Sequence, residues 1–272
     1  MLNKLLKYEF RDTARTIPLF YLVSLIFAGL VLLAKLLNIE WFQMTTSIVL
    51  LLLGIAVSII TFVIIIIRFY KNLYSNEGYL MFTLPVKPGL LLASKSIAAF
   101  FWIILSYCVT AGAFFISIYG LGVAGELTFA MNELKSSGAG KILYLFIPAI
   151  VLATLYLLGQ IYFAVTMANM PAFQSIGIAA AFLVFIAANI ILQIVEAMFT
   201  IFVPFSVEVG FAENISASLT SKTMFGYILE RIKGPEPTGV VIGLGGYVFE
   251  VLMVCILFYV TSRMIKNKVS LK

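Results

Sequence analysis

Acids and amides inside long apolar segments are the side chains of this sequence best suited to chemistry. Asn189, Gln193 and Glu196 follow one another at steps of four and three residues, so they share one face of a helix. Glu250 lies near the middle of a second apolar segment. An acid in hydrocarbon is costly and is usually turned toward protein or water. We therefore expect these four residues to line a substrate path or an interface between subunits.

The same residues also have a purely structural interpretation. Asn189 and Gln193 could hydrogen-bond between neighbouring helices, as amides in membrane spans often do. Glu250 could be held as a protonated acid that takes part in the same packing. The sequence leaves both interpretations open.

Catalytic chemistry of the common kinds has no residues to support it here. The chain contains no histidine, which excludes histidine-based zinc proteases, Ser-His-Asp hydrolases and histidine-ligated haem. It contains no GxxxxGK[ST] sequence, so it has no P-loop for a nucleotide. We expect no catalytic residue, no metal site and no cofactor in this chain. Any energy for work would come from a gradient or from a partner.

Six apolar runs supply the elements that position these polar residues. Of the 272 residues, 62% are hydrophobic and 11% are charged, which is too apolar for a soluble domain of this size. About 20 apolar residues cross a bilayer as a helix. We therefore predict an all-α integral membrane protein, a single domain over residues 1–272, with six transmembrane helices at 17–37, 45–67, 96–120, 142–168, 176–203 and 240–262.

The charge distribution gives an orientation. With both termini on one side, as six spans require, that side holds 12 of the 18 Lys and Arg residues. The positive-inside rule then places both termini in the cytoplasm. The formal charge of +6 is explained by this topology and by attraction to anionic membrane lipid, so we expect no nucleic-acid partner.

Residues 1–16 have the pattern of an amphipathic helix. Lys4, Lys7, Arg11 and Arg15 recur at helical spacing on one face, and leucines with Phe10 lie on another. This pattern predicts an interfacial helix whose basic residues anchor it to the membrane surface before the first span. The alternative is a charged flank that only fixes topology.

Residues 68–95 form a cytoplasmic loop with an apolar centre between the second and third spans. Such a centre offers apolar side chains to a partner, and the alternative is that it packs on lipid or on neighbouring helices. Pro85 and Pro88 are expected to stop a docking helix there. The predicted docking residues are Glu77, Gly78, Tyr79, Leu80, Met81, Phe82, Thr83, Leu84 and Pro85.

The outer loop at 204–239 mixes apolar residues with charged ones. This mixture predicts short re-entrant or interfacial helices before the sixth span. The glycine cluster at 243–246 follows at the start of that span. It lacks the strand-turn-helix context of a phosphate site, so we expect it to serve close helix packing.

These features together resemble the membrane subunits of type-2 ABC transporters, the ABC-2-type permeases. The architectural match covers the whole chain, with its basic N-terminal helix, six spans, long outer loop and basic C-terminus. The local match covers about residues 68–96, where NEGYLMFTLPV is similar to the EGYLxxTLP-type loop of small permeases from Gram-positive bacteria. In that family this loop carries the coupling helix that docks on a separate ATPase.

The resemblance implies a permease domain in a bacterial cytoplasmic membrane that works with two ATPase subunits and a second permease subunit, identical or homologous. ATP and Mg would then be bound by the ATPase. The apolar spans suggest export of an amphipathic peptide, an antimicrobial or a lipid-like substrate. The alternatives are a gradient-driven carrier or channel that uses Glu196 and Glu250, or a non-transporting membrane scaffold or sensor.

Overall fold

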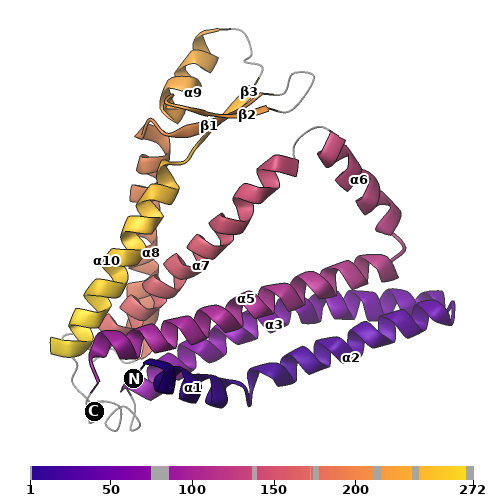
Figure 1. Cartoon of the computed structure of the whole chain (residues 1–272), viewed down its shortest axis with the longest axis horizontal. Helices are drawn as coiled ribbons and strands as arrows, with labels where there is room; N and C mark the ends of the chain where they lie inside the picture. The colour runs from indigo at the N-terminus through magenta and orange to yellow at the C-terminus, as the bar shows by residue number, and fades with distance from the viewer. Residues whose placement is uncertain are drawn as a thin grey trace. The chain divides into compact units, whose positions relative to one another are not determined.

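The computed structural model describes residues 2–74, 86–136, 140–171, 173, 178–210, 216–234 and 239–267. Six of the described helices are long and apolar enough to cross a membrane, which confirms the prediction of a mainly helical, multi-pass membrane protein. The chain divides near residue 130 into two compact units. The six helices are α2 (Ile17–Leu36), α3 (Glu40–Tyr74), α5 (Pro88–Gly120), α7 (Gly140–Ala168), α8 (Ile178–Phe202) and α10 (Gly245–Asn267) (Figure 1).

The N-terminal unit is built from α2, α3 and α5, with the shorter helix α1 (Leu2–Thr13) packed on α5. Its core includes Ala28, Val31, Leu50 and Ala113, which are all buried. The helices approach closely where small residues face each other, since a methyl group on Gly54 would lie 3.0 Å from the Cβ of Ala113. Small contact residues are a common means of packing helices in membranes.

Hydroxyl groups tie these three helices together within the spans. The Tyr21 hydroxyl in α2 lies 2.8 Å from Ser106 Oγ in α5. Ser106 in turn donates to Thr61 Oγ1 in α3 at 2.8 Å. Interhelical bonds of this kind satisfy polar groups that lipid cannot.

Contacts also join α2 to α5 at the end of the N-terminal unit where α2 turns into α3. α2 passes into α3 through Asn38, which has a positive φ of 54°, a conformation that asparagine tolerates better than most residues. Lys35 Nζ donates to the Tyr119 carbonyl at 2.8 Å and lies 3.1 Å from the centre of the Tyr119 ring. The turn between α2 and α3 is therefore held against the end of α5.

The loop predicted at 68–95 has different bounds in the structure. α3 continues to Tyr74, and α5 begins at Pro88. Pro88 lies in the first turn of α5, where the missing N–H of proline has no helical partner to lose, and its predicted role in ending a docking helix stays a prediction. Residues 77–85, the predicted docking residues, lie outside the described residues.

The C-terminal unit contains α7, α8 and α10, which pack against one another in all three pairings. Tyr156, Phe249 and Leu257 form its buried cluster. Glycines at the end of strand β3 (Gly239–Gly243) and at the start of α10 permit this packing, because a Cβ on Gly243 or Gly245 would collide with the carbonyl oxygens of Thr200 or Phe199 in α8. The predicted packing role of the glycine cluster is confirmed. A further helix, α6 (Ala124–Ser136), lies between α5 and α7 in sequence.

The predicted re-entrant or interfacial helices at 204–239 are replaced largely by a sheet. Strands β1 (Ser206–Gly210), β2 (Ser216–Thr220) and β3 (Gly239–Gly243) form an antiparallel sheet in the order β2-β1-β3 (Figure 1). Among the residues of this loop that the structure describes, α9 (Met224–Lys233) is the helical segment. β-branched residues, which favour strands over helix, are frequent in two of the strands: Val207 and Val209 in β1, and Val240, Val241 and Ile242 in β3. Because β3 occupies the predicted start of the sixth span, α10 begins only at Gly245.

Candidate functional site

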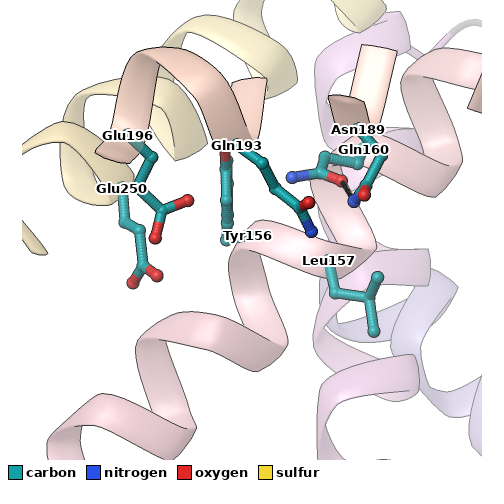
Figure 2. Close-up of a pocket in the computed structure, with 7 residues that line it drawn as sticks. All are labelled: Tyr156, Leu157, Gln160, Asn189, Gln193, Glu196 and Glu250. Atoms are coloured by element: carbon teal, nitrogen blue, oxygen red, sulfur yellow. Dashed lines mark hydrogen bonds between the residues drawn. The ribbon is translucent and has the colours of Figure 1, made fainter. Parts of the chain in front are cut away.

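A polar cavity of about 380 Å³ lies within the C-terminal unit, among α7, α8 and α10. All four polar residues predicted from the sequence line it: Asn189, Gln193 and Glu196 from one face of α8, and Glu250 from α10. The remaining lining residues come from α7. Figure 2 shows the full set, Tyr156, Leu157, Gln160, Asn189, Gln193, Glu196 and Glu250.

The close approach of α8 and α10 places the two acids in this cavity. A Cβ on Gly246 would lie 3.7 Å from Glu196 Cγ, so α10 passes directly beside that side chain. Glu250 follows Gly246 by four residues and therefore lies on the same face of α10. The local sequence that allows two backbones to meet thus also brings two carboxyl groups to one cavity.

Two buried polar atoms in the cavity form no hydrogen bond with the residues that the structure describes. Glu250 is 8% exposed and Tyr156 is 6% exposed. Within the described part of the chain, neither Glu250 Oε2 nor the Tyr156 hydroxyl forms a hydrogen bond. Buried polar atoms are rarely left in this state in folded proteins. These two atoms are therefore available to a ligand.

The amides of the cavity behave differently. Asn189 Nδ2 donates to Gln160 Oε1 at 2.9 Å, which joins α8 to α7. The structural interpretation is therefore confirmed for Asn189. Gln193, one turn further along α8, lines the same cavity beside Glu196. Asn189 links α8 to α7. The two acids and Tyr156 are the lining residues that can bind a ligand or a proton.

Tyr156 is the member of this site that sequence reasoning missed. Because tyrosine was counted as an apolar residue, Tyr156 was treated as part of the fourth apolar run, which forms α7, and not as a polar site residue. Its position four residues before Gln160 was the available signal, because it places the phenol on the same helical face as an amide.

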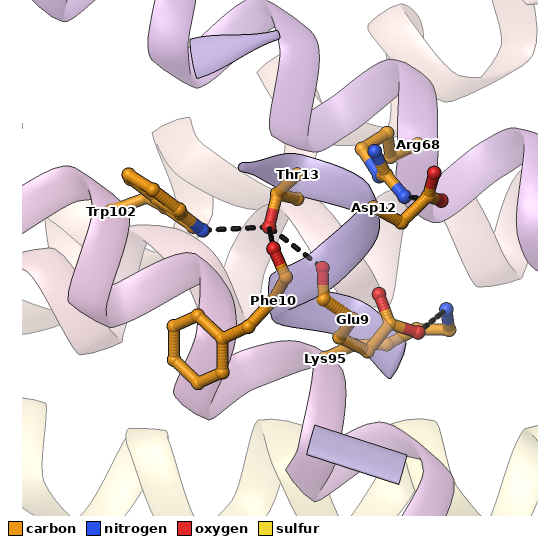
Figure 3. Close-up of polar contacts among 7 residues, drawn as sticks. All are labelled: Glu9, Phe10, Asp12, Thr13, Arg68, Lys95 and Trp102. Atoms are coloured by element: carbon orange, nitrogen blue, oxygen red, sulfur yellow. Dashed lines mark hydrogen bonds and ion pairs between the residues drawn. The ribbon is translucent and has the colours of Figure 1, made fainter. Parts of the chain in front are cut away.

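A second polar cluster lies in the N-terminal unit, where α1 meets α3 and α5 (Figure 3). Lys95 Nζ lies 2.5 Å from Glu9 Oε1, and the two side chains are only 4% and 12% exposed. Arg68 forms an ion pair with Asp12. We call Glu9, Asp12, Thr13, Arg68, Lys95 and Trp102 the α1 contact cluster.

Aromatic and hydroxyl contacts complete the α1 contact cluster. The Trp102 indole N–H donates to Thr13 Oγ1 at 2.7 Å, and the Thr13 hydroxyl donates to the Glu9 carbonyl at 2.7 Å. The Phe10 ring meets the Phe101 ring edge to face, with centroids 5.1 Å apart. The C-terminal part of α1, from Glu9 to Thr13, is thus attached to α5.

The predicted anchoring residues, three in α1 and one in the turn that follows it, do not belong to this cluster. Lys4, Lys7, Arg11 and Arg15 are all exposed, as a membrane-anchoring role requires, and that role stays a prediction. The sequence pattern divided α1 into basic and apolar faces but did not single out its acids. Glu9 and Asp12 gain their importance only from Lys95 and Arg68, which are distant in sequence.

Neither site has the ligands of a typical metal centre. Among the residues that the structure describes, no group of three or more His, Cys, Asp or Glu side chains could hold a metal ion.

Comparison with protein-family models, with curated proteins and with solved structures gave no match to this chain.

Proposed function

We propose that this chain is a membrane-spanning subunit of an ATP-driven transporter of the ABC-2 type. In this proposal, residues 77–85 dock on a separate ATPase, which binds and hydrolyses ATP with Mg. Two ATPase subunits and a second permease subunit would complete the transporter. The cargo would be an amphipathic peptide or a lipid-like molecule, exported across a bacterial cytoplasmic membrane.

The α1 contact cluster is the observation that carries this proposal. It joins α1, α3 and α5 at the end of the unit from which residues 75–87 emerge. Lys95 in α5 and Arg68 in α3 each hold an acid of α1. A force applied to the segment between Tyr74 and Pro88 would therefore reach three helices together rather than one.

The burial of the Lys95–Glu9 pair makes this connection stiff. A buried ion pair cannot exchange its partners for water without a large penalty, so its geometry persists under load. The Trp102–Thr13 hydrogen bond and the edge-to-face contact of Phe10 with Phe101 fix the orientation of α1 on α5. Such stiffness suits an element that transmits movement from a partner into membrane spans.

The proposal can be tested by replacing the predicted contact side chains. The chain would be co-purified with ATPases encoded beside it, with Tyr79, Leu80 and Phe82 replaced together by alanine. We expect loss of the complex and of membrane-stimulated ATP hydrolysis. The matched control replaces Leu219, Phe225 and Ile232, three exposed apolar residues of the β2–α9 region, and should leave the complex intact. A complex that survives the first triple substitution with unchanged ATP hydrolysis refutes the docking.

A gradient-driven carrier is a second candidate, favoured by one observation. Glu196 and Glu250 face one cavity, and Glu250 Oε2 has no hydrogen-bond partner in the described chain. Paired acids within spans are common in proton- and ion-coupled transport. In this case, collapse of the ion gradient across proteoliposomes would stop transport. Transport that continues without a gradient but needs ATP would exclude the carrier.

A further inference from the structure

We infer that the cavity among α7, α8 and α10 binds the primary ammonium group of a small amphipathic amine. This inference does not depend on ATPase docking, because it rests only on residues of the C-terminal unit. It assigns a ligand class to the cavity that neither transport candidate specifies.

The charge of the cavity is the first reason. Glu196 and Glu250 both line it, and its other lining residues are neutral. Within the described residues, the ion pairs involve other acids, namely Glu9, Asp12 and Glu208. Charged acids in a span are normally paired, with protein or with a ligand. The cavity therefore favours a cationic occupant.

The unpartnered atoms are the second and independent reason. Glu250 Oε2 and the Tyr156 hydroxyl are buried and form no hydrogen bond within the described chain. Figure 2 shows the Tyr156 side chain extending from α7 toward the α8 residues Glu196 and Gln193. An ammonium group has three N–H donors and no acceptor. It can donate to Glu250, to the phenol oxygen of Tyr156 and to Glu196 at once.

The size of the cavity separates an organic amine from a bare metal ion. A water molecule occupies about 30 Å³ in the liquid, so a cavity of about 380 Å³ is many times larger than a bound ion needs. This volume lies in the range of pockets for small organic ligands, roughly 300–1,000 Å³. Two acids are also fewer than the ligand sets by which proteins usually enclose divalent cations.

The apolar lining determines the rest of the ligand. Leu157 and the ring of Tyr156 line the same cavity as the acids, and Tyr156 is the nearer of the two to Glu196. An aromatic face attracts an ammonium group, and an aliphatic side chain accepts the hydrocarbon attached to it. A short alkyl chain ending in a primary ammonium group satisfies both parts of the lining.

Direct binding of hexylammonium to the full chain tests the inference. The protein would be held in phosphatidylcholine nanodiscs, without ATPase, and binding of radiolabelled hexylamine measured at equilibrium. We expect saturable binding that unlabelled hexylamine displaces and that hexanol, the neutral analogue of similar size, does not. Glu250→Gln should weaken binding at least tenfold, and Tyr156→Phe several-fold. Glu208→Gln, a change at an exposed acid of β1, should leave binding unchanged.

Several results would overturn the inference. Binding that does not saturate, or that hexanol displaces equally well, would indicate partitioning into lipid. Displacement by sodium or potassium at concentrations similar to those of hexylamine would indicate an inorganic cation site. Equal binding by Glu250→Gln and by the unchanged chain would remove the cavity from consideration. Circular dichroism of each variant separates loss of the ligand from loss of the fold, and Tyr156→Phe preserves the shape of the cavity. Failure here leaves ATPase docking untouched, because the assay contains no ATPase.

Discussion

The two units of this chain treat buried charge in opposite ways. In the N-terminal unit, Lys95 is matched with Glu9 and Arg68 with Asp12. In the C-terminal unit, Glu196 and Glu250 share a cavity without a cationic side chain among its lining residues. The first arrangement joins the short helix α1 to α3 and α5, and the second lies between α8 and α10; all of these helices except α1 are long and apolar enough to span a membrane. The paired charges hold helices together, whereas the unpaired acids are left to interact with something that enters.

The largest effect expected from this comparison is at Lys95. Lys95→Met leaves Glu9 buried and unpaired, which should cost about 3–5 kcal/mol of unfolding free energy. SDS titration in mixed micelles would measure the loss. The double variant Glu9→Gln with Lys95→Met should recover much of it, because no unpaired charge remains.

The exposed pair Lys222–Glu208 serves as the matched control, with an N–O distance of 3.6 Å and side chains 51% and 40% exposed. Lys222→Met should change stability by at most about 1 kcal/mol. Similar losses at Lys95 and Lys222 would contradict the view that burial makes the first pair structural.

A smaller effect is expected where α8 and α10 approach. Gly245→Ala places a methyl group against the Phe199 carbonyl and should cost roughly 1–3 kcal/mol as the helices separate. The same change should weaken hexylammonium binding, because the acids move apart. Gly112→Ala in α5 has open space around the new methyl group and should be neutral or slightly stabilising. Unchanged stability and binding in Gly245→Ala would mean that the close approach does not set the cavity.

Replacing one of the two cavity acids should not lower the free energy of unfolding, in contrast to the loss expected for Lys95→Met. Glu250→Gln removes an acid without breaking an ion pair, so the free energy of unfolding should stay the same or rise by roughly 1 kcal/mol. The same titration would measure it in the absence of amine. A loss as large as that of Lys95→Met would show that Glu250 is a structural group, and the contrast between the units would disappear.

The smallest expected effect concerns the amide contact between α7 and α8. Asn189→Ala removes the bond to Gln160 and should cost about 0.6 kcal/mol, the average for such bonds in membrane helices. Asn169→Ala is the control, since its amide donates to Val165 of its own helix at 2.7 Å. Thermal unfolding of the two variants side by side would resolve the difference. Equal shifts would indicate that the interhelical bond adds no coupling.

The six long helices could be predicted because hydrocarbon imposes a minimum length of apolar sequence. Their ends could not, because hydropathy marks where lipid ends rather than where the helix ends. Residues 68–74 and 88–95 are polar enough to leave the apolar run yet continue α3 and α5 as helix. Backbone hydrogen bonding carries a helix onward until a turn or a proline interrupts it.

The sheet and the ion pairs show two other limits of the sequence. Strands β1 and β3 are only five residues long, so their β-branched residues were too few to stand out from a generally apolar chain. The pairs Glu9–Lys95 and Asp12–Arg68 join residues that are remote in sequence, and only the fold reveals them. The stripe Asn189, Gln193 and Glu196 was predictable because its members lie on one helix at helical spacing.

α3 and α5 continue as helix beyond the ends of the predicted spans, and the length of these extensions gives a distance from the hydrocarbon core. The seven residues from Arg68 to Tyr74 add about 10 Å to α3, and the eight from Pro88 to Lys95 add about 12 Å to α5, at 1.5 Å per residue. The headgroup layer on each side of a bilayer is thinner than this, roughly 5–8 Å. With the spans ending at the predicted residues 67 and 96, the described ends of the two helices, Tyr74 and Pro88, lie beyond the lipid headgroups. A protein that contacted these two helix ends would meet them in water, without entering the membrane.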